Sequence, residues 1–395
     1  MNVGKRIRLC LLAAALLLCS GCMDWMLPSG QTAIADPDKY RGQFSDRWCY
    51  SRLPERLRTD YGTIYTALTD GFARDETVRI AEKSETVIGI TIRLPEPIAR
   101  EEAETLYTAV LYDHPSFFYV QGNYFLSDST DSTTFRTLTL CYSMPADERR
   151  TARTALEAAV AAIRGQLPPE PYDRELYLYD QLMERCTYDA AAAADMKATP
   201  QAYTAYGALV EGRAVCEGYA RALQLLLADA GFAGVPVTGF DHGSQNGHMW
   251  NLVQVNGALY YLDATYDDSE EVPHHRFFNI TTQQLLQDRA IDDSPFWGEE
   301  CTATADNYYV RQGTYIDTYQ RQVIAETLAA RLRQGDTAVE LRFAPNKFAN
   351  GLLFLKNSTQ TLKLLNPLLA DTGRTIRGYR LYTSPDYELL TFEPE

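Results

Sequence analysis

Positive charge is scarce in this sequence. Lysine and arginine together number 37 against 52 aspartates and glutamates, so the formal net charge is -15 at pH 7. Nucleic acids and anionic membrane surfaces attract proteins through basic patches. The charge balance therefore argues against either of them as the main partner, and we expect no nucleic-acid binding.

The sequence also lacks the residue spacings of a metal site. Its cysteines are scattered, without the short ligand spacing that is typical of zinc. His274 and His275 lie near Asp267 and Asp268, but neither a helical nor a paired spacing relates them. We therefore expect no bound metal. Internal repeats and low-complexity tracts are missing as well, so nothing of that kind changes the expected fold class.

An apolar run, Leu9 to Leu18, is too short to span a bilayer as a mature helix. Basic residues precede the run and the small residues Ser20 and Gly21 follow it, which is the layout of a secretory signal. The segment ending at Cys22 resembles a bacterial lipobox, although Cys19 stands where leucine is usual. We expect residues 1–21 to be a signal peptide and lipidated Cys22 to anchor the exported protein to the outer face of the cell membrane. Ordinary signal-peptidase cleavage is the alternative.

The chain has 395 residues, too many for one core of ordinary size. Two adjacent prolines at 168 and 169 mark one boundary, and the pattern changes again from about Asn307. We expect a tether over 22–45, an N-terminal α+β module over 46–167, a central domain over 168–300 and a C-terminal α+β module over 301–395. In the first module the pattern predicts one strand over 78–94 and a hairpin from 117–126 and 135–142.

Cys216 opens a helical pattern in the central domain. Apolar residues follow it at spacings of three and four as far as Ala230, and Gly231 supplies a stop. Thr199 and Pro200 predict the start of a preceding helix that runs to about residue 210. Unpaired backbone N–H groups and the helix dipole at a first turn favour a thiolate, which is the form that attacks a carbonyl. Taken alone, Cys216 also fits a buried core thiol, and Cys49, Cys141, Cys186 and Cys301 fit core thiols or disulfide partners.

Two strand patterns, 248–255 and 258–265, flank Asn256-Gly257, which is a strong signal for a two-residue hairpin turn. With that turn, paired residue numbers have a constant sum, and His248 and Asp263 lie on one face as diagonal neighbours. A register slip of one residue would place them on opposite faces. Nucleophile, base and orienting acid are the groups that thiol acyl transfer requires.

The segments AVCEGYARAL, GHMWNLV and YYLDATYDD resemble the three motifs of the bacterial transglutaminase-like superfamily. The resemblance covers about residues 170–290 and implies a papain-like α+β domain, in which a helix packs on an antiparallel sheet. It also implies Cys216 as nucleophile, His248 as base and Asp263 as the orienting acid. Tyr266 is a departure, because many relatives have tryptophan there. The segment DHPSFFYV, residues 113–120, resembles the companion domain of exported members.

The oxyanion donor stays open at this point. The backbone N–H of Cys216 is one candidate. Relatives use a side chain upstream of the nucleophile, so Gln201, Tyr203 and Tyr206 are further candidates. His242, in a polar loop, is either a substrate contact or a solvated loop histidine.

We therefore expect an exported, membrane-anchored enzyme that forms a thioester with the acyl group of an amide in a protein or peptide, including cell-wall peptide. Water as the acceptor would make it a peptidase or amidase, and an amine would make it a transglutaminase. The chemistry needs no metal or organic cofactor. The alternatives are a catalytically silent module that binds peptide or cell wall in the same cleft, and a structural lipoprotein that binds through its flanking modules.

Overall fold

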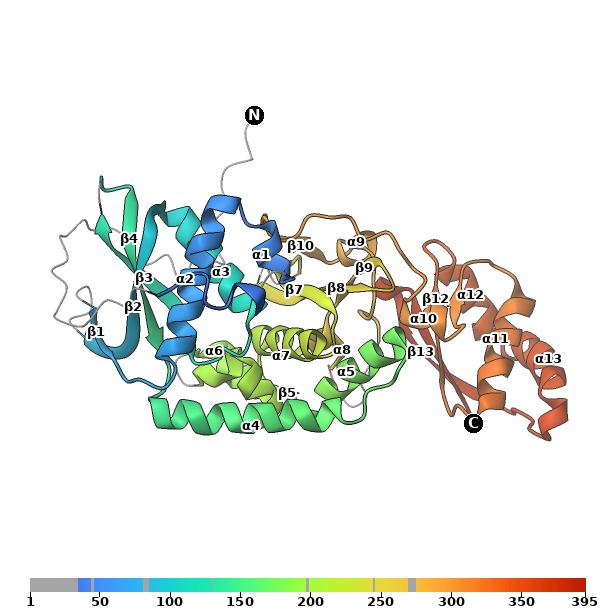
Figure 1. The fold of residues 1–395 in the computed structure, drawn as a ribbon. Coiled ribbons are helices and arrows are strands. Elements are labelled where there is room, and N and C mark those ends of the chain that lie inside the picture. The colour runs from blue at the N-terminus through green and yellow to red at the C-terminus, as the bar shows by residue number, and fades with distance from the viewer. Residues whose placement is uncertain are drawn as a thin grey trace, which may run out of the picture. The chain divides into compact units, whose positions relative to one another are not determined.

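The structure, a computed structural model, describes residues 35–43, 46–80, 85–129, 131–196, 199–243, 246–268 and 275–395. Helices alternate with sheets that are antiparallel apart from two short parallel pairs, so the chain has the expected α+β fold (Figure 1). Residue contacts divide it into one unit that ends at Thr302 and a second unit, Ala303–Glu395. The expected signal segment, Cys22 and most of the expected tether lie outside the described residues. Within the described ranges, no helix combines the length and apolar character needed to cross a membrane.

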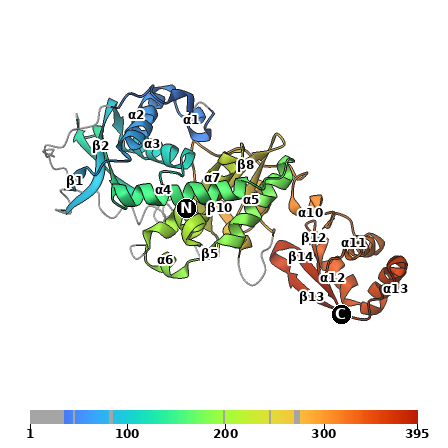
Figure 2. The same cartoon turned by 60° about the horizontal axis from the view of Figure 1, so that its bottom comes forward.

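The first unit begins with a four-stranded sheet in the order β1-β2-β4-β3. Helices α2 and α3 pack on this sheet, and α4 leads from it toward the next part of the unit (Figure 2). The elements of this region are η2 (Arg41–Gln43), α1 (Trp48–Arg52), α2 (Glu55–Gly71), β1 (Thr77–Ile80), β2 (Glu85–Ala99), α3 (Arg100–Asp113), β3 (Val120–Ser129), β4 (Thr134–Tyr142) and α4 (Ala146–Arg164).

The prediction of a single strand over residues 78–94 was wrong. Two strands, β1 and β2, occupy this stretch and pair antiparallel, with Thr77 opposite Ile88 and Ile80 opposite Glu85. The polar sequence AEKS separates them. Pairing with β1 satisfies backbone groups of β2 that would otherwise be exposed at the edge of the sheet. The hairpin predicted from 117–126 and 135–142 is confirmed as β3 and β4.

Asp113, the first residue of the DHPSFFYV segment, is a buried cap for α1. Its two carboxylate oxygens accept hydrogen bonds from the backbone N–H groups of Cys49 and Tyr50, each at 2.9 Å. A carboxylate at a helix start satisfies donors that the helix itself leaves unpaired. The capped helix then presents Trp48, whose indole N–H donates to the carbonyl oxygen of Phe296 at 2.7 Å. These bonds tie the N-terminal module to a segment more than 200 residues further along the chain.

The central part of the first unit contains the second four-stranded sheet, in the order β10-β7-β8-β9. Helix α7 packs against β7 and β8, and α5 packs on α7 (Figures 1 and 2). Its elements are α5 (Pro171–Arg185), β5 (Thr187–Tyr188), α6 (Ala190–Ala194), η4 (Pro200–Tyr203), η5 (Gly207–Glu211), β6 (Arg213–Ala214), α7 (Cys216–Asp229), β7 (Ala233–Asp241), β8 (Gly247–Val255), β9 (Ala258–Leu262), α8 (Ala264–Asp267), α9 (Thr282–Leu285) and β10 (Arg289–Ile291).

The prediction of one continuous helix from Thr199 to about residue 210 was also wrong. The chain forms a 3-10 turn, η4, and then a short π-helix, η5. Thr204 separates them with extended backbone, and its hydroxyl accepts a hydrogen bond from the N–H of Gly207 at 3.2 Å. A side chain at Gly207 would come within 2.2 Å of the carbonyl oxygen of Gln201. Because Gly207 has no side chain, the start of η5 can pack directly against the backbone of η4.

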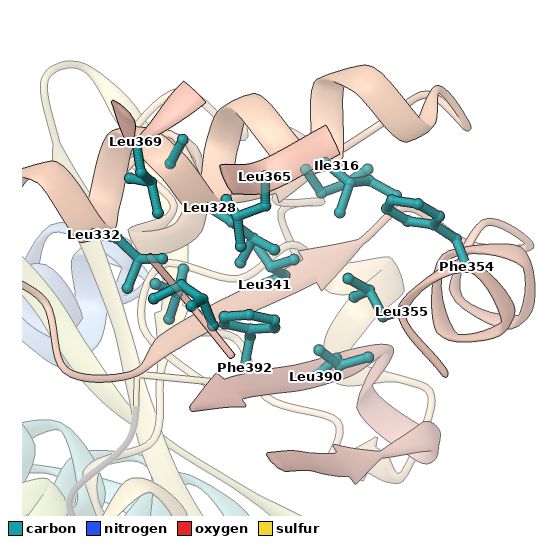
Figure 3. Packing of buried hydrophobic residues seen from close by; sticks show 14 of the residues in the cluster. Ile316, Leu328, Leu332, Leu341, Phe354, Leu355, Leu365, Leu369, Leu390 and Phe392 are labelled. Carbon is teal, nitrogen blue, oxygen red and sulfur yellow. The ribbon is translucent and has the colours of Figure 1, made fainter. Parts of the chain in front are cut away.

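The second unit has its own sheet, in the order β11-β12-β14-β13, and its own core. Leu328, Leu341, Leu365, Leu390 and Phe392 come from both helices and strands and meet in this core (Figure 3). Its elements are α10 (Tyr308–Arg311), β11 (Tyr315–Ile316), α11 (Arg321–Gln334), β12 (Val339–Phe343), α12 (Phe348–Lys356), α13 (Ser358–Leu368), η6 (Ala370–Thr372), β13 (Tyr379–Ser384), η7 (Pro385–Tyr387) and β14 (Leu389–Pro394).

Candidate active site

Cys216 is the first residue of α7, as the helical pattern predicted. Its side chain is half-buried, whereas Cys49, Cys141, Cys186 and Cys301 are buried. No disulfide joins any of these five described cysteines. The helix start is held closely against η4, because a side chain at Gly218 would lie 2.3 Å from the carbonyl oxygen of Ala202. Cys216 is therefore an accessible thiol on a tightly packed backbone.

The hairpin that carries the histidine has the predicted turn and register. Asn256 and Gly257 adopt positive φ angles of 49° and 81°, which a type I′ turn requires at both positions. Val255 pairs with Ala258, and Asn251 pairs with Leu262. The residue numbers of each pair have the predicted constant sum.

The predicted strand over 258–265 is too long, since β9 ends at Leu262. Asp263 leaves the ladder and becomes the N-cap of α8: its Oδ1 accepts a hydrogen bond from the N–H of Tyr266 at 3.2 Å. The constant sum of residue numbers would pair Trp250 with Asp263 and His248 with Thr265. Both pairings are absent from the described ladder, which stops one step earlier, at Asn251 and Leu262. A carboxylate that caps a helix start draws the chain out of the strand.

His248 and Asp263 nevertheless meet. The Nε2 atom of His248 lies 2.8 Å from Oδ2 of Asp263, and the two side chains are 7% and 1% exposed. Cys216 is also a neighbour of this imidazole, and its interaction with His248 raises the pKa of the histidine. Because Nε2 is engaged by Asp263, Nδ1 is the ring nitrogen that is left to face the thiol.

The surroundings of His248 favour its charged form. Burial alone would lower the pKa of His248, but the charge of Asp263, its hydrogen bond and the neighbouring Cys216 together raise that pKa to about 9. Burial would likewise raise the pKa of Asp263, yet the charges of His248 and Arg289 hold it below its usual range. At neutral pH the pair is therefore imidazolium and carboxylate.

Arg289, which no sequence pattern indicated, is fully buried beside His248 and Asp263. Its Nη2 donates to Oδ2 of Asp263 at 2.7 Å, so Asp263 accepts from both His248 and Arg289 on one oxygen. Arg289 begins β10, which pairs with the edge of β7, with Arg289 opposite Asp241. No motif around Arg289 marks it as a site residue.

Aromatic rings enclose the imidazole. The ring of Tyr266 meets that of His248 edge-on with centroids 4.9 Å apart, and the ring of Trp250 lies at 5.7 Å. The hydroxyl of Tyr266 donates to Oδ2 of Asp241 at 3.0 Å. Tyr266, the expected departure from the resemblance, therefore packs where it limits the movement of the histidine.

The side-chain candidates for the oxyanion have other contacts. The hydroxyl of Tyr203 donates to the carbonyl oxygen of Ala192 at 2.9 Å. Gln201 and Tyr206 line a pocket of about 340 Å³ together with residues of α4 and with Glu211. The backbone N–H of Cys216 is the candidate that lies at the thiol itself.

His242 and His275 have partners outside this cluster. His242 is exposed, and its backbone N–H donates to the carbonyl oxygen of Asp288. His275 is bound to Asp180 at 2.7 Å, and His274 lies outside the described residues. In the part of the chain that the structure covers, no three histidine, cysteine, aspartate or glutamate side chains gather as a metal site would need.

Comparison with known proteins gives one family match. Residues 158–264 match the model of the transglutaminase-like superfamily, and no curated protein matches the chain. Among solved structures, a protein named TGase matches with 10% identity and a TM-score of 0.28, over 47% of this chain and 53% of its own. A candidate cysteine protease from Cytophaga hutchinsonii matches with 14% identity and a TM-score of 0.23, over 35% and 55%. The chain thus spans about half the length of these two proteins.

Proposed function

The chain contains a domain of the transglutaminase-like superfamily, and we propose that this domain is a thiol acyl-transfer enzyme acting on amide bonds of proteins or peptides. Cys216 is the nucleophile, His248 the acid and base, and Asp263 the group that orients His248. The observation that carries the proposal is the imidazole of His248, which binds a buried carboxylate through Nε2 and whose pKa is also raised by the neighbouring, half-buried Cys216.

The reaction proceeds in two transfers. The Cys216 thiolate attacks the amide carbonyl carbon, and the carbonyl oxygen takes up the displaced electron pair. As the C–N bond breaks, imidazolium His248 gives its proton to the leaving nitrogen, and a thioester remains. Water or an amine then attacks the thioester, His248 takes the proton of the attacking group, and the Cys216 sulfur leaves.

The oxyanion is stabilised first by the backbone N–H of Cys216. This donor belongs to the first turn of α7, where the helix leaves its N–H groups unpaired and the positive end of its dipole favours negative charge. We propose Tyr203 as a second donor, because its pKa is raised by burial and also by the charge of Cys216. The Tyr203 hydroxyl would first have to break its hydrogen bond to the carbonyl oxygen of Ala192.

The acceptor decides whether the enzyme hydrolyses or cross-links. Exclusion of water from the thioester would favour an amine, and a wet cleft would favour hydrolysis. Tyr188, whose pKa is raised by burial and by the charge of Cys216, has 41% of its surface exposed. We propose an extracytoplasmic substrate of protein or peptide character, including cell-wall peptide.

Alkylation of the thiol tests the catalytic proposal without a known substrate. Iodoacetamide at neutral pH, with the modified peptide measured by mass spectrometry, should label Cys216 faster than the buried cysteines. Cys216→Ala should abolish fast labelling and the turnover of a peptide library, and Cys186→Ala should preserve both. Equal labelling of parent and Cys216→Ala would refute the proposal. Fast labelling without any turnover would favour the silent binding module.

The anchor is a separate proposal that rests on the lipobox resemblance. We propose that the chain is exported, that Cys22 carries the lipid, and that the tether over 22–45 separates the membrane from modules 46–167, 168–300 and 301–395. Metabolic labelling with an alkyne fatty acid should mark the parent and spare Cys22→Ser. Labelling of both proteins would contradict it.

A further inference from the structure

Arg289 is a buried cation beside the candidate catalytic pair. Its side chain is 1% exposed and its guanidinium bridges two carboxylates, with Nη2 at 2.7 Å from Asp263 and Nη1 at 2.7 Å from Asp288. Burying an arginine is costly unless its charge is matched in this way. The bond to Asp263 is made on Oδ2, the same oxygen that binds His248.

Two aromatic rings restrain the guanidinium of Arg289. Its central carbon lies 4.4 Å from the ring centre of Tyr266 and 4.1 Å from that of Phe277. Such cation–π contacts favour a charged, planar group. Tyr266 in turn contacts the ring of His248. The same aromatic side chain therefore restrains both groups that bind Asp263.

We propose that Arg289 is a positioning residue for acyl transfer, which keeps the Asp263 carboxylate charged and aimed at His248. The inference rests on the proposed function, because it assumes that the pair serves Cys216. Arg289 does not touch the thiol or the substrate in this scheme. It acts through Asp263, which acts through His248.

Four groups from separate elements face Asp263. They are His248 on β8, Arg289 on β10, Tyr266 on α8 and Tyr179 on α5, whose own pKa is raised by burial and by the charges of Asp267 and Asp263. Without Arg289, only His248 and the hydrogen bond from the Tyr266 N–H would offset the burial of Asp263, so the carboxylate would take up a proton at higher pH. A neutral Asp263 no longer stabilises the imidazolium, and Cys216 loses its reactive form. The rate of Cys216 alkylation falls on the acidic side of its pH profile, which we call the acidic limb. Loss of the guanidinium should therefore move this limb to higher pH.

The pH profile of Cys216 alkylation by iodoacetamide tests this role in the full-length protein. Arg289→Met should move the acidic limb up by about one pH unit. Arg289→Lys keeps the charge and should restore most of the parent profile. Arg276→Met is the matched control: that guanidinium contacts the carbonyl oxygen of Tyr266 at 3.1 Å and lies near Asp267 rather than Asp263. It should leave the limb in place.

The outcomes separate this inference from the proposed function. A parent Cys216 that reacts no faster than an ordinary thiol refutes the proposed function. A reactive parent whose profile is unchanged in Arg289→Met refutes only the role of Arg289. A fall in rate at every pH, with unmoved limbs and no rescue by lysine, would assign Arg289 to folding alone and would also overturn the inference. Thermal unfolding of each variant shows which proteins are folded at the assay temperature.

Discussion

The pair of His248 and Asp263 should make the stability of the first unit depend on pH in a defined window. The folded protein raises the pKa of His248 from its ordinary value of 6.5 to about 9. That difference corresponds to about 3 kcal/mol in favour of the imidazolium in the folded state. Below pH 6.5 the histidine is protonated in both states, so the whole contribution is present. As the pH rises from 6.5 to about 9, the contribution falls by about 1.4 kcal/mol per pH unit and then disappears.

His248→Asn removes the titrating group and should flatten this part of the stability profile. Urea unfolding followed by tryptophan fluorescence is suited to the test, because the tryptophans among the described residues, Trp48, Trp250 and Trp297, all belong to the first unit. Burial raises the pKa of both Asp60 and Asp267 to about 7. Those carboxyl groups titrate in parent and variant alike, so their effect cancels in the difference between the two proteins.

His242→Asn serves as the control, since this histidine is exposed and the variant leaves the buried pair intact. It should keep the slope of the parent between pH 6.5 and about 9. The reasoning fails if parent and His248→Asn lose stability in parallel across this window, because the imidazolium would then contribute nothing that depends on the fold.

Three further substitutions test packing and hydrogen bonding in the first unit. Gly257→Ala places a side chain at a φ of 81° and should cost about 1 kcal/mol in urea unfolding. Gly218→Ala brings a methyl group within 2.3 Å of the Ala202 carbonyl oxygen, so it should cost about 1–3 kcal/mol and slow alkylation of the thiol that starts α7. Trp48→Phe removes the buried hydrogen bond to Phe296 and should cost about 1–3 kcal/mol in thermal unfolding.

Local signals were sufficient to predict the positions of Cys216 and His248. A helical stripe with a glycine stop defines α7, and Asn256-Gly257 defines the turn. Both depend on residues only a few positions apart, where propensity and turn chemistry act directly. The register of β8 and β9 follows from the turn alone, which is why it was predicted correctly as far as Leu262.

The end of β9 was missed because two signals compete at Asp263. The alternation of ALYYLDAT favours a longer strand, while an aspartate three residues before Tyr266 favours a helix cap. The cap prevails, since Oδ1 of Asp263 binds the Tyr266 N–H. The backbone N–H of Asp263 also donates to the carbonyl oxygen of Phe277 at 3.2 Å, a contact that local sequence does not encode. His248 and Asp263 still meet because the side chain of Asp263 reaches back toward β8.

The residues next to Arg289 in the sequence do not indicate that it lies at the site. A glycine in another strand does indicate that a backbone segment packs closely there. Gly239 lies within the strand pattern of β7 and pairs with both His248 and Ile291. A side chain at Gly239 would lie 2.0 Å from the carbonyl oxygen of Ala290. A glycine inside a strand is typical of close approach by another backbone, and here the approaching strand is β10, which begins with Arg289. A larger residue at 239 would displace β10 and move the Arg289 guanidinium away from Asp263. The orientation of His248 therefore depends on a glycine in β7, a strand that contributes no catalytic group.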